Sequence, residues 1–144
     1  MDKINYHFID VEIPDFDPEF FGLWITEIAH SYKRLVGDLS FVFCTDNYLL
    51  EINKKHLGHD YYTDIITFNY NEENSLSADV FISYDRIKDN AAIFSDGNEA
   101  LELKRVIAHG ILHLVGFNDK NEEEKKEMRK QEEKCLQLIV SRET

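Results

Sequence analysis

The sequence is poor in cysteine and has no long apolar run. Its two cysteines, Cys44 and Cys135, lie far apart and form no Cys-x-x-Cys pair, so we expect neither a disulfide scaffold nor a cysteine-based metal site. No apolar stretch approaches the ~18 residues that a membrane span requires. The first residues, MDKINYHFIDVEI, alternate in polarity and lack the apolar core of a signal peptide. We therefore expect a cytoplasmic protein with no membrane segment.

Proline and glycine are scarce as well. Pro14 and Pro18 are the only prolines among 144 residues, and the six glycines are scattered, which excludes a Pro- or Gly-rich linker. The length is typical of one domain, and the 43% of hydrophobic residues suffices for a core. We expect a single domain that spans residues 1–144.

Basic residues are outnumbered by acidic ones. Sixteen Lys and Arg residues against 28 Asp and Glu residues give a net charge of −12. Such a field repels nucleic acid, because phosphate contacts need Lys and Arg. A nucleic-acid function would therefore need a metal ion or a local cationic patch. The stretch NEEEKKEMRKQEEK mixes both signs and is typical of a solvated helix face.

Hydrophobic periodicity and capping signals predict four strands and five helices. The strands are expected over residues 4–13, 39–43, 64–70 and 79–83, and the helices over residues 18–35, 46–57, 85–94, 98–115 and 121–140. Gly37 is interpreted as the end of the first helix. The polar loop between the third and fourth strands favours a hairpin. Together these elements predict an α+β domain with a mixed four-stranded sheet.

The most informative segment is HGILHLVGFND, from His109 to Asp119. Residues four apart on a helix share a face, so His109 and His113 can bind one ion. Gly116 allows the backbone to leave the helix, and Asp119 can then return as a third ligand. Two imidazoles and a carboxylate leave a fourth position for water, as in catalytic zinc sites. We predict one Zn²⁺ per chain, on a central helix and the turn after it.

Two structural alternatives accompany this prediction. A bare pair of histidines four apart is commonly an ordinary feature of a helix, and only the added glycine and third ligand favour a metal. Asp119 could instead cap the last helix through backbone N–H groups near Asn121 and Glu122.

The residue after the first histidine bears on the reaction. The spacing H-x3-H-x2-G-x2-D is that of the metzincin peptidases, in which Glu follows the first histidine as general base. Here that position is Gly110, which leaves no base and is expected to open room beside the ion. A peptidase is therefore disfavoured. Hydrolysis of a phosphodiester is the natural alternative, because the ion can neutralise phosphate charge and polarise a phosphoryl oxygen.

Two motifs resemble those of the YbeY family. The HGILHLVGF run is similar to the family's H-G-x-L-H-L-x-G-Y-D-H, and NKKHLGHDYYTDIITF, residues 53–68, is similar to L-N-x-x-Y-R-x-x-D-x-x-T-[DN]-V-L-S-F. SADVFIS and the total length also match. The resemblance implies a bacterial zinc-dependent endoribonuclease that acts on single-stranded RNA. It further implies a role in maturing the 3′ end of small-subunit rRNA and in ribosome quality control, with the ribosome as partner.

The sequence departs from the family pattern at three positions. Asp119 stands where the family has its third zinc-binding histidine, and a carboxylate is an acceptable zinc ligand. The family's Tyr-Arg pair falls on His56 and Leu57, so an arginine suited to phosphate contact is missing. Tyr62 replaces a common proline, which we interpret as a structural change.

Other residues could contact the RNA. We expect these contacts from Lys54, Lys55, His56 and His59, with Lys104 and Arg105 as alternates. The resemblance also implies that Asn53, Thr63, Asp64 and Asp79 lie near the cleft, although capping and turn hydrogen bonds explain these four residue types better.

Neither the spacing nor the resemblance identifies a general base, so metal-bound water and the RNA 2′-hydroxyl both remain open as the nucleophile. Two other functions remain as rivals. One is a non-catalytic ribosome-assembly factor with a structural zinc, which Leu57 and the charge of −12 favour. The other is a zinc peptidase, which Gly110 disfavours.

Overall fold

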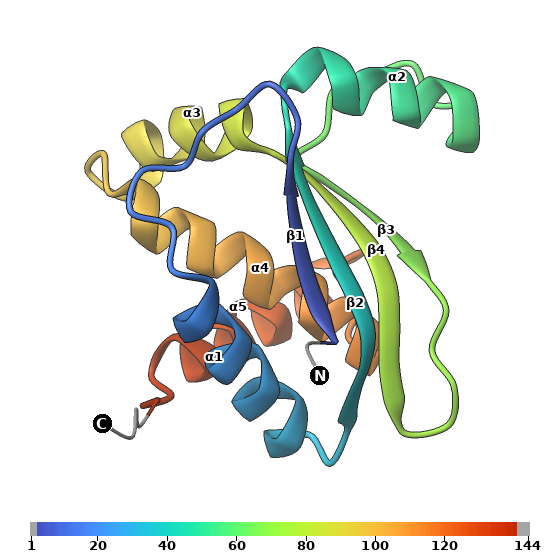
Figure 1. Ribbon diagram of the computed structural model, residues 1–144, viewed down its shortest axis with the longest axis vertical. Coiled ribbons are helices and arrows are strands. Elements are labelled where there is room, and N and C mark those ends of the chain that lie inside the picture. Colours follow the sequence, from blue (N-terminus) through green and yellow to red (C-terminus); the bar gives the residue numbers. More distant parts are fainter. Residues whose placement is uncertain (1–2, 141–144) are drawn as a thin grey trace.

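The computed structural model describes residues 3–140. In chain order the elements are β1 (Ile4–Phe8), α1 (Pro18–Ser31), β2 (Leu35–Cys44), α2 (Asp46–Leu57), β3 (Ile65–Asn69), β4 (Ser75–Ser83), α3 (Tyr84–Phe94), α4 (Glu99–Val115) and α5 (Glu122–Leu136) (Figure 1). The described residues thus form the four strands and five helices that periodicity predicts. Among these helices, none is both long and apolar enough to cross a membrane.

The four strands form one mixed sheet in the order β1-β2-β4-β3. β1 pairs with β2 and β2 with β4 in parallel, while β3 and β4 form an antiparallel hairpin. The predicted α+β class and the predicted hairpin are both confirmed. The hairpin places β3 at the edge of the sheet.

The two faces of the sheet are covered unequally. One face carries buried residues such as Phe41, Val80 and Ile82 and belongs to the main core, to which α1, α3, α4 and α5 also contribute. Figure 1 shows these helices together on one side of the sheet. On the other face, α2 covers a smaller cluster around Leu49 and Ile66. Helix α4 therefore packs on the main-core face of the sheet, where it contacts β3 and β4. Helices α1, α3 and α5 pack against α4.

Several boundaries differ from the prediction for local reasons. The first helix ends at Ser31, because Lys33 adopts a left-handed conformation (φ 60°) and the chain reverses into β2. Gly37 lies inside β2, where a side chain would collide with Ser77 and come 3.0 Å from the carbonyl oxygen of Leu76. Gly37 allows β2 to lie close to β4, so its interpretation as a helix terminator is wrong.

The remaining boundary differences concern strands and the last helix. β1 ends at Phe8 rather than residue 13, and β4 begins at Ser75, within the segment expected to be a loop. The last helix ends at Leu136 instead of residue 140. Alternating polarity continues past the end of β1, whereas β4 begins in a polar segment that periodicity does not mark, so periodicity alone does not locate where pairing starts or stops.

Candidate metal centre

The two histidines of the motif lie on a partly exposed side of helix α4. Asn98 caps the N-terminus of the helix, and its side chain accepts a hydrogen bond from Leu101 N at 3.0 Å. One face of α4 is buried against the sheet, whereas the side chains of His109 and His113 remain 23% and 32% exposed. They therefore face the solvent-accessible edge of the core, where an ion and a substrate can reach them.

The turn after α4 returns Asp119 to the histidines. Gly116 adopts φ 124°, and its N–H donates to the carbonyl oxygens of Leu112 and His113. This conformation favours glycine. Asp119 Oδ2 consequently lies 3.3 Å from His109 Nε2 and 3.6 Å from His113 Nε2. The three residues predicted from spacing are thus brought together.

The donor atoms have the geometry of a metal-binding triangle. The two Nε2 atoms are 3.0 Å apart, so the triangle's edges measure 3.0, 3.3 and 3.6 Å. With bond lengths of about 2.0–2.1 Å, a tetrahedral zinc site separates its ligand atoms by roughly 3.3 Å. The residues present therefore fit a zinc-sized ion.

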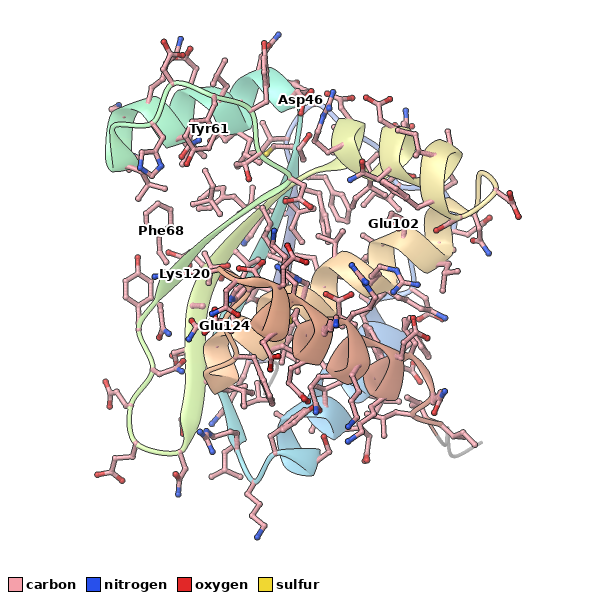
Figure 2. All side chains as sticks on the ribbon, turned by 180° about the vertical axis from the view of Figure 1, so that it is seen from behind. Asp46, Tyr61, Phe68, Glu102, Lys120 and Glu124 are labelled. Carbon is pink, nitrogen blue, oxygen red and sulfur yellow. The ribbon has the colours of Figure 1, made fainter. Side chains whose placement is uncertain are left out.

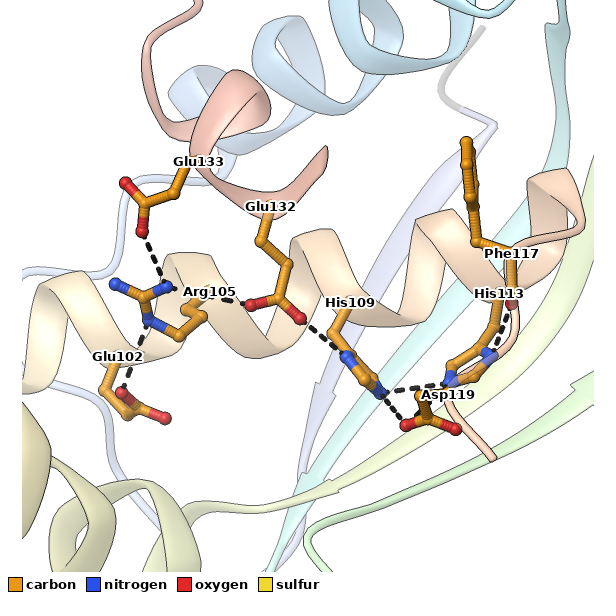
Figure 3. A network of polar contacts seen from close by, with 8 residues as sticks. All are labelled: Glu102, Arg105, His109, His113, Phe117, Asp119, Glu132 and Glu133. Atoms are coloured by element: carbon orange, nitrogen blue, oxygen red, sulfur yellow. Dashed lines mark hydrogen bonds and ion pairs between the residues drawn. The ribbon is translucent and has the colours of Figure 1, made fainter. Parts of the chain in front are cut away.

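The other ring nitrogens support the same conclusion. His109 Nδ1 lies 2.7 Å from Glu132 Oε2, and His113 Nδ1 lies 2.9 Å from the carbonyl oxygen of Phe117 (Figure 3). A carboxylate and a carbonyl only accept hydrogen bonds, so each neutral ring carries its proton on Nδ1. The two unprotonated Nε2 atoms then face each other and Asp119 with lone pairs alone. A cation or a proton between these acceptors stabilises such a cluster.

The capping alternative for Asp119 is wrong. Asn121 caps α5 by accepting a hydrogen bond from Glu124 N at 2.8 Å. In return, the side chain of Glu124 accepts from Lys120 N at 2.9 Å. This reciprocal arrangement resembles a capping box and satisfies the start of the helix. Asp119 stands outside it and is directed toward the histidines (Figure 3).

The charges around the site favour a cation. Burial lowers the pKa of His109, but the hydrogen bond to Glu132 and the negative charges of Glu132 and Asp119 raise that pKa by more. The net pKa of His109 is therefore raised. Arg105 lies 3.7 Å from Glu132 and 3.0 Å from Glu133, so it partly balances the buried Glu132 carboxylate.

Glu132 contacts the site although the sequence pattern does not single it out. It lies in the mixed-charge stretch interpreted as a solvated face, yet it is buried. It lies four residues after Met128 and three before Cys135, and both of these are buried on the same side of α5. This spacing from two buried apolar residues is the sequence signal that indicates the burial of Glu132.

Asp64 and Asp79 have different surroundings. Burial raises the pKa of the Asp64 carboxyl, while the nearby His109 opposes this rise. Asp64 is therefore close enough to His109 for their charges to interact. Asp79 pairs with Phe68 across the hairpin, and its neighbour Val80 faces the main core. Because side chains alternate along a strand, Asp79 is on the sheet face opposite α4.

Gly110 does not open room beside the ion, so that expectation is wrong. A Cβ at this position would lie 3.0 Å from Ile65 Cδ1 and 3.7 Å from Val80 Cγ1. Gly110 instead lets α4 lie close to strands β3 and β4. The same contacts would crowd the glutamate that a peptidase of this motif would need.

Four of the expected RNA contacts lie elsewhere, at the C-terminal end of α2 and in the turn after it, whereas the alternates Lys104 and Arg105 lie on α4. Lys54 lies 3.8 Å from Glu51 and 3.6 Å from Asp60, and the His59 ring stacks on Tyr61. Lys55 and His56 are exposed on the same helix. In Figure 2, Tyr61, in the loop between α2 and β3, is separate from Lys120, which follows Asp119. Within residues 3–140, no hydrogen bond or ion pair joins these α2 residues to His109 or His113.

The other two cleft residues make local contacts. Asn53 donates a hydrogen bond to the carbonyl oxygen of Tyr61 at 2.9 Å, and the Thr63 hydroxyl lies 3.5 Å from the carbonyl oxygen of Ile65. Both contacts shape the loop between α2 and β3, which agrees with the turn role favoured from their residue types.

Comparisons with known proteins extend the resemblance to almost the whole chain. The family model described as Endoribonuclease YbeY matches residues 16–140. An Endoribonuclease YbeY from Parabacteroides distasonis is 44% identical over 137 residues, which are 94% of this chain and 95% of the relative. Another from Phocaeicola vulgatus is 46% identical over 136 residues, 94% of this chain and 98% of the relative.

A solved structure agrees with the fold. The solution structure of a protein from Thermotoga maritima superposes with a TM-score of 0.63 at 25% identity, and the match covers 90% of this chain and 88% of that one. The resemblance carried by the two sequence motifs is therefore confirmed.

Proposed function

The chain belongs to the YbeY family, and from this premise we propose that it is a metal-dependent endoribonuclease specific for single-stranded RNA. The observation that carries the proposal is the triangle of His109, His113 and Asp119, whose lone pairs converge on one point. We propose one Zn²⁺ per chain at this point. The biological substrate in this proposal is rRNA, at the 3′ end of the small-subunit molecule, with a further role in ribosome quality control in the cytoplasm.

The residues of the chain prepare this site for an ion and a phosphodiester. Glu132 holds His109, and the carbonyl oxygen of Phe117 holds His113, so both Nε2 atoms keep their direction. The ligand side chains are 23–39% exposed, which leaves one side of the site accessible to RNA. A bound divalent ion supplies a Lewis acid that polarises a phosphoryl oxygen and makes a nearby water more acidic.

A second group of residues is proposed to contact the RNA. Lys54, Lys55, His56 and His59 lie together at the end of α2 and in the turn after it. Reversing the charge at Lys54 and Lys55 together should weaken RNA binding and flatten its dependence on salt, because fewer counterions are then released. Binding titrations at several salt concentrations measure both effects, and unchanged affinity and slope would remove these lysines from the interface.

The experiment that tests the function compares cleavage with folding. Purified protein is incubated with a single-stranded RNA, with and without a chelator, and its unfolding midpoint is measured under both conditions. We expect cleavage that stops on chelation and returns when zinc is restored, in a protein that stays folded. His113→Ala serves as a control with one metal ligand removed.

Two other outcomes would contradict the proposal. If chelation abolishes folding and RNA is never cut, the metal is structural and the chain is an assembly factor. If casein is hydrolysed in a chelator-sensitive manner, the chain is a peptidase. The sequence argues against this last outcome, since Gly110 carries no general base and its packing against Ile65 and Val80 would crowd a glutamate there.

A further inference from the structure

A groove of about 510 Å³ extends from the candidate metal centre between helices α4 and α5. Helix α4 lines it with Arg105 and His109, one turn apart, and α5 lines it with Lys125 and Arg129, also one turn apart. Asp119, from the turn that joins the two helices, lies at the metal end. We call this feature the α4–α5 groove. It shares two of its residues with the metal site, so any chain held in the groove also reaches the ion.

The cations of this groove are available to an anionic ligand. Arg129 is exposed, and its guanidinium makes no hydrogen bond or ion pair within the part of the chain that the structure describes. Lys125 has only a long contact to Glu122, 3.9 Å between two largely exposed groups. Such pairs contribute little in water. On a chain with a net charge of −12, two uncommitted cations beside a metal site favour a phosphate backbone as the occupant.

Acidic residues in the groove are partly balanced by Arg105. Arg105 lies between Glu102, Glu132 and Glu133, at 3.9, 3.7 and 3.0 Å respectively, and Glu102 and Glu132 are buried (Figure 3). Arg105 thus offsets one of the negative charges on the wall near His109, and the burial of Glu102 and Glu132 keeps their carboxylates away from a ligand at the surface. The exposed charges that a ligand meets first are those of Lys125 and Arg129.

An aromatic ring lies on the groove wall as well. Phe94, the last residue of α3, lines the groove and is 76% exposed. Burying so exposed a ring against a ligand would be favourable, and an RNA base has a flat face that stacks on it. Proteins that bind single strands combine a cationic path for the backbone with aromatic rings for the bases. Both elements are present here.

We propose that the α4–α5 groove binds the backbone of single-stranded RNA on one side of the phosphodiester that is presented to the metal centre. Arg129 and Lys125 contact phosphates, and Phe94 stacks on a base. The inference rests on the proposed nuclease function and adds the path of the substrate. It also provides a guanidinium near the site in a chain that has Leu57 where the family motif has arginine.

Binding of a short oligouridine with 2′-O-methyl sugars tests the proposal, with the metal-loaded protein and a gel to show that the probe stays intact. Arg129→Gln and Lys125→Gln are compared with Lys126→Gln and Lys130→Gln. The control pair removes the same charge from the same helix at exposed positions outside the groove. The change in net charge is therefore matched, and only the location differs.

Two measurements should distinguish the groove variants from the controls. Each groove variant should bind more weakly than the controls, and the slope of log affinity against log salt should fall by about 0.7 for each lost phosphate contact. Phe94→Ala should weaken binding roughly five-fold or more at an unchanged slope, because stacking releases no counterions. The controls should keep the wild-type slope.

Two results would overturn the inference, and they are distinguishable. If the wild type binds and cuts RNA while Arg129→Gln and Lys125→Gln match the controls, the groove is not the path of the RNA and the proposed function stands. If the zinc-loaded wild type neither binds nor cuts single-stranded RNA, the proposed function fails and the inference fails with it. Metal content and unfolding midpoints of all variants should equal those of the wild type.

Discussion

Replacing Glu132 with glutamine should weaken metal binding, although Glu132 is not itself one of the proposed ligands. The substitution keeps the shape of the side chain and removes its charge. In the native protein, Glu132 Oε2 lies 2.7 Å from His109 Nδ1, within the range of a charge-assisted hydrogen bond. This bond fixes the ring and makes Nε2 a stronger donor to an ion.

The size of the effect follows from the strength of this bond. A hydrogen bond to a charged group contributes about 1.5–3 kcal/mol, against about 0.5–1.5 kcal/mol for a neutral one. The side chain of Glu132 is only 11% exposed, so solvent screens the interaction little. The difference of about 1–1.5 kcal/mol corresponds to a roughly ten-fold weaker metal affinity. Glu132→Ala, which loses orientation as well as charge, should cost up to about 100-fold.

The neighbouring glutamate provides a matched control. Glu133 also pairs with Arg105, at 3.0 Å, but makes no contact with His109. Zinc affinities of Glu132→Gln and Glu133→Gln would be measured by competition with a chelating dye. We expect the loss in Glu132→Gln alone. Wild-type affinity in Glu132→Gln, or an equal loss in Glu133→Gln, would refute the reasoning, because the effect would then be absent or would act through Arg105.

Three further predictions concern the same region. Asp119→Ala should lose most of the metal, whereas Asp119→His should keep it and shift the activity–pH profile to lower pH, because imidazole neutralises less of the ion's charge; full metal content in Asp119→Ala, measured by elemental analysis, would contradict this. Gly110→Ala should destabilise the fold by about 1–3 kcal/mol, because its Cβ would lie 3.0 Å from Ile65 Cδ1, whereas Gly22→Ala, with nothing within 4 Å of its Cβ, should not. Denaturant titrations compare the two variants, and equal stability would contradict the packing of Gly110 against Ile65. Because the pKa of His109 is raised in the folded protein, its protonated form stabilises the metal-free protein below about pH 6.5, and this contribution is lost as pH rises through the folded-state pKa. Zinc binding needs neutral imidazole and therefore strengthens over the same range. The unfolding midpoints of zinc-loaded and chelated protein should diverge with rising pH, and a constant difference would contradict this.

Local sequence signals predict the parts of the site that are close together in the chain. His109 and His113 are one helical turn apart, and Gly116 directs the chain so that Asp119 reaches them three residues later. Each step depends only on helix periodicity and on the conformational freedom of glycine. The metal triangle is therefore predictable from residue spacing alone.

The supporting residues depend on tertiary packing. Glu132 reaches His109 only because α5 docks on α4. The hydrogen bond from Trp24 Nε1 to the carbonyl oxygen of Cys135, at 3.0 Å, holds the end of α5 against α1 as well. The role of Gly110 likewise depends on how closely α4 approaches the sheet. Charge pattern and motif spacing contain neither distance. For this reason the sequence alone predicts a solvated helix at α5 and an opening beside the ion at Gly110.

A titration of metal-free protein with zinc tests the central claim most directly. Bound metal per chain and the rate of single-stranded RNA cleavage are measured in the same samples. We predict that both rise together and level off at one zinc per chain, and that His113→Ala neither retains zinc nor cuts RNA. Zinc bound at full stoichiometry by His113→Ala, or cleavage by the wild type that does not depend on added zinc, would contradict it.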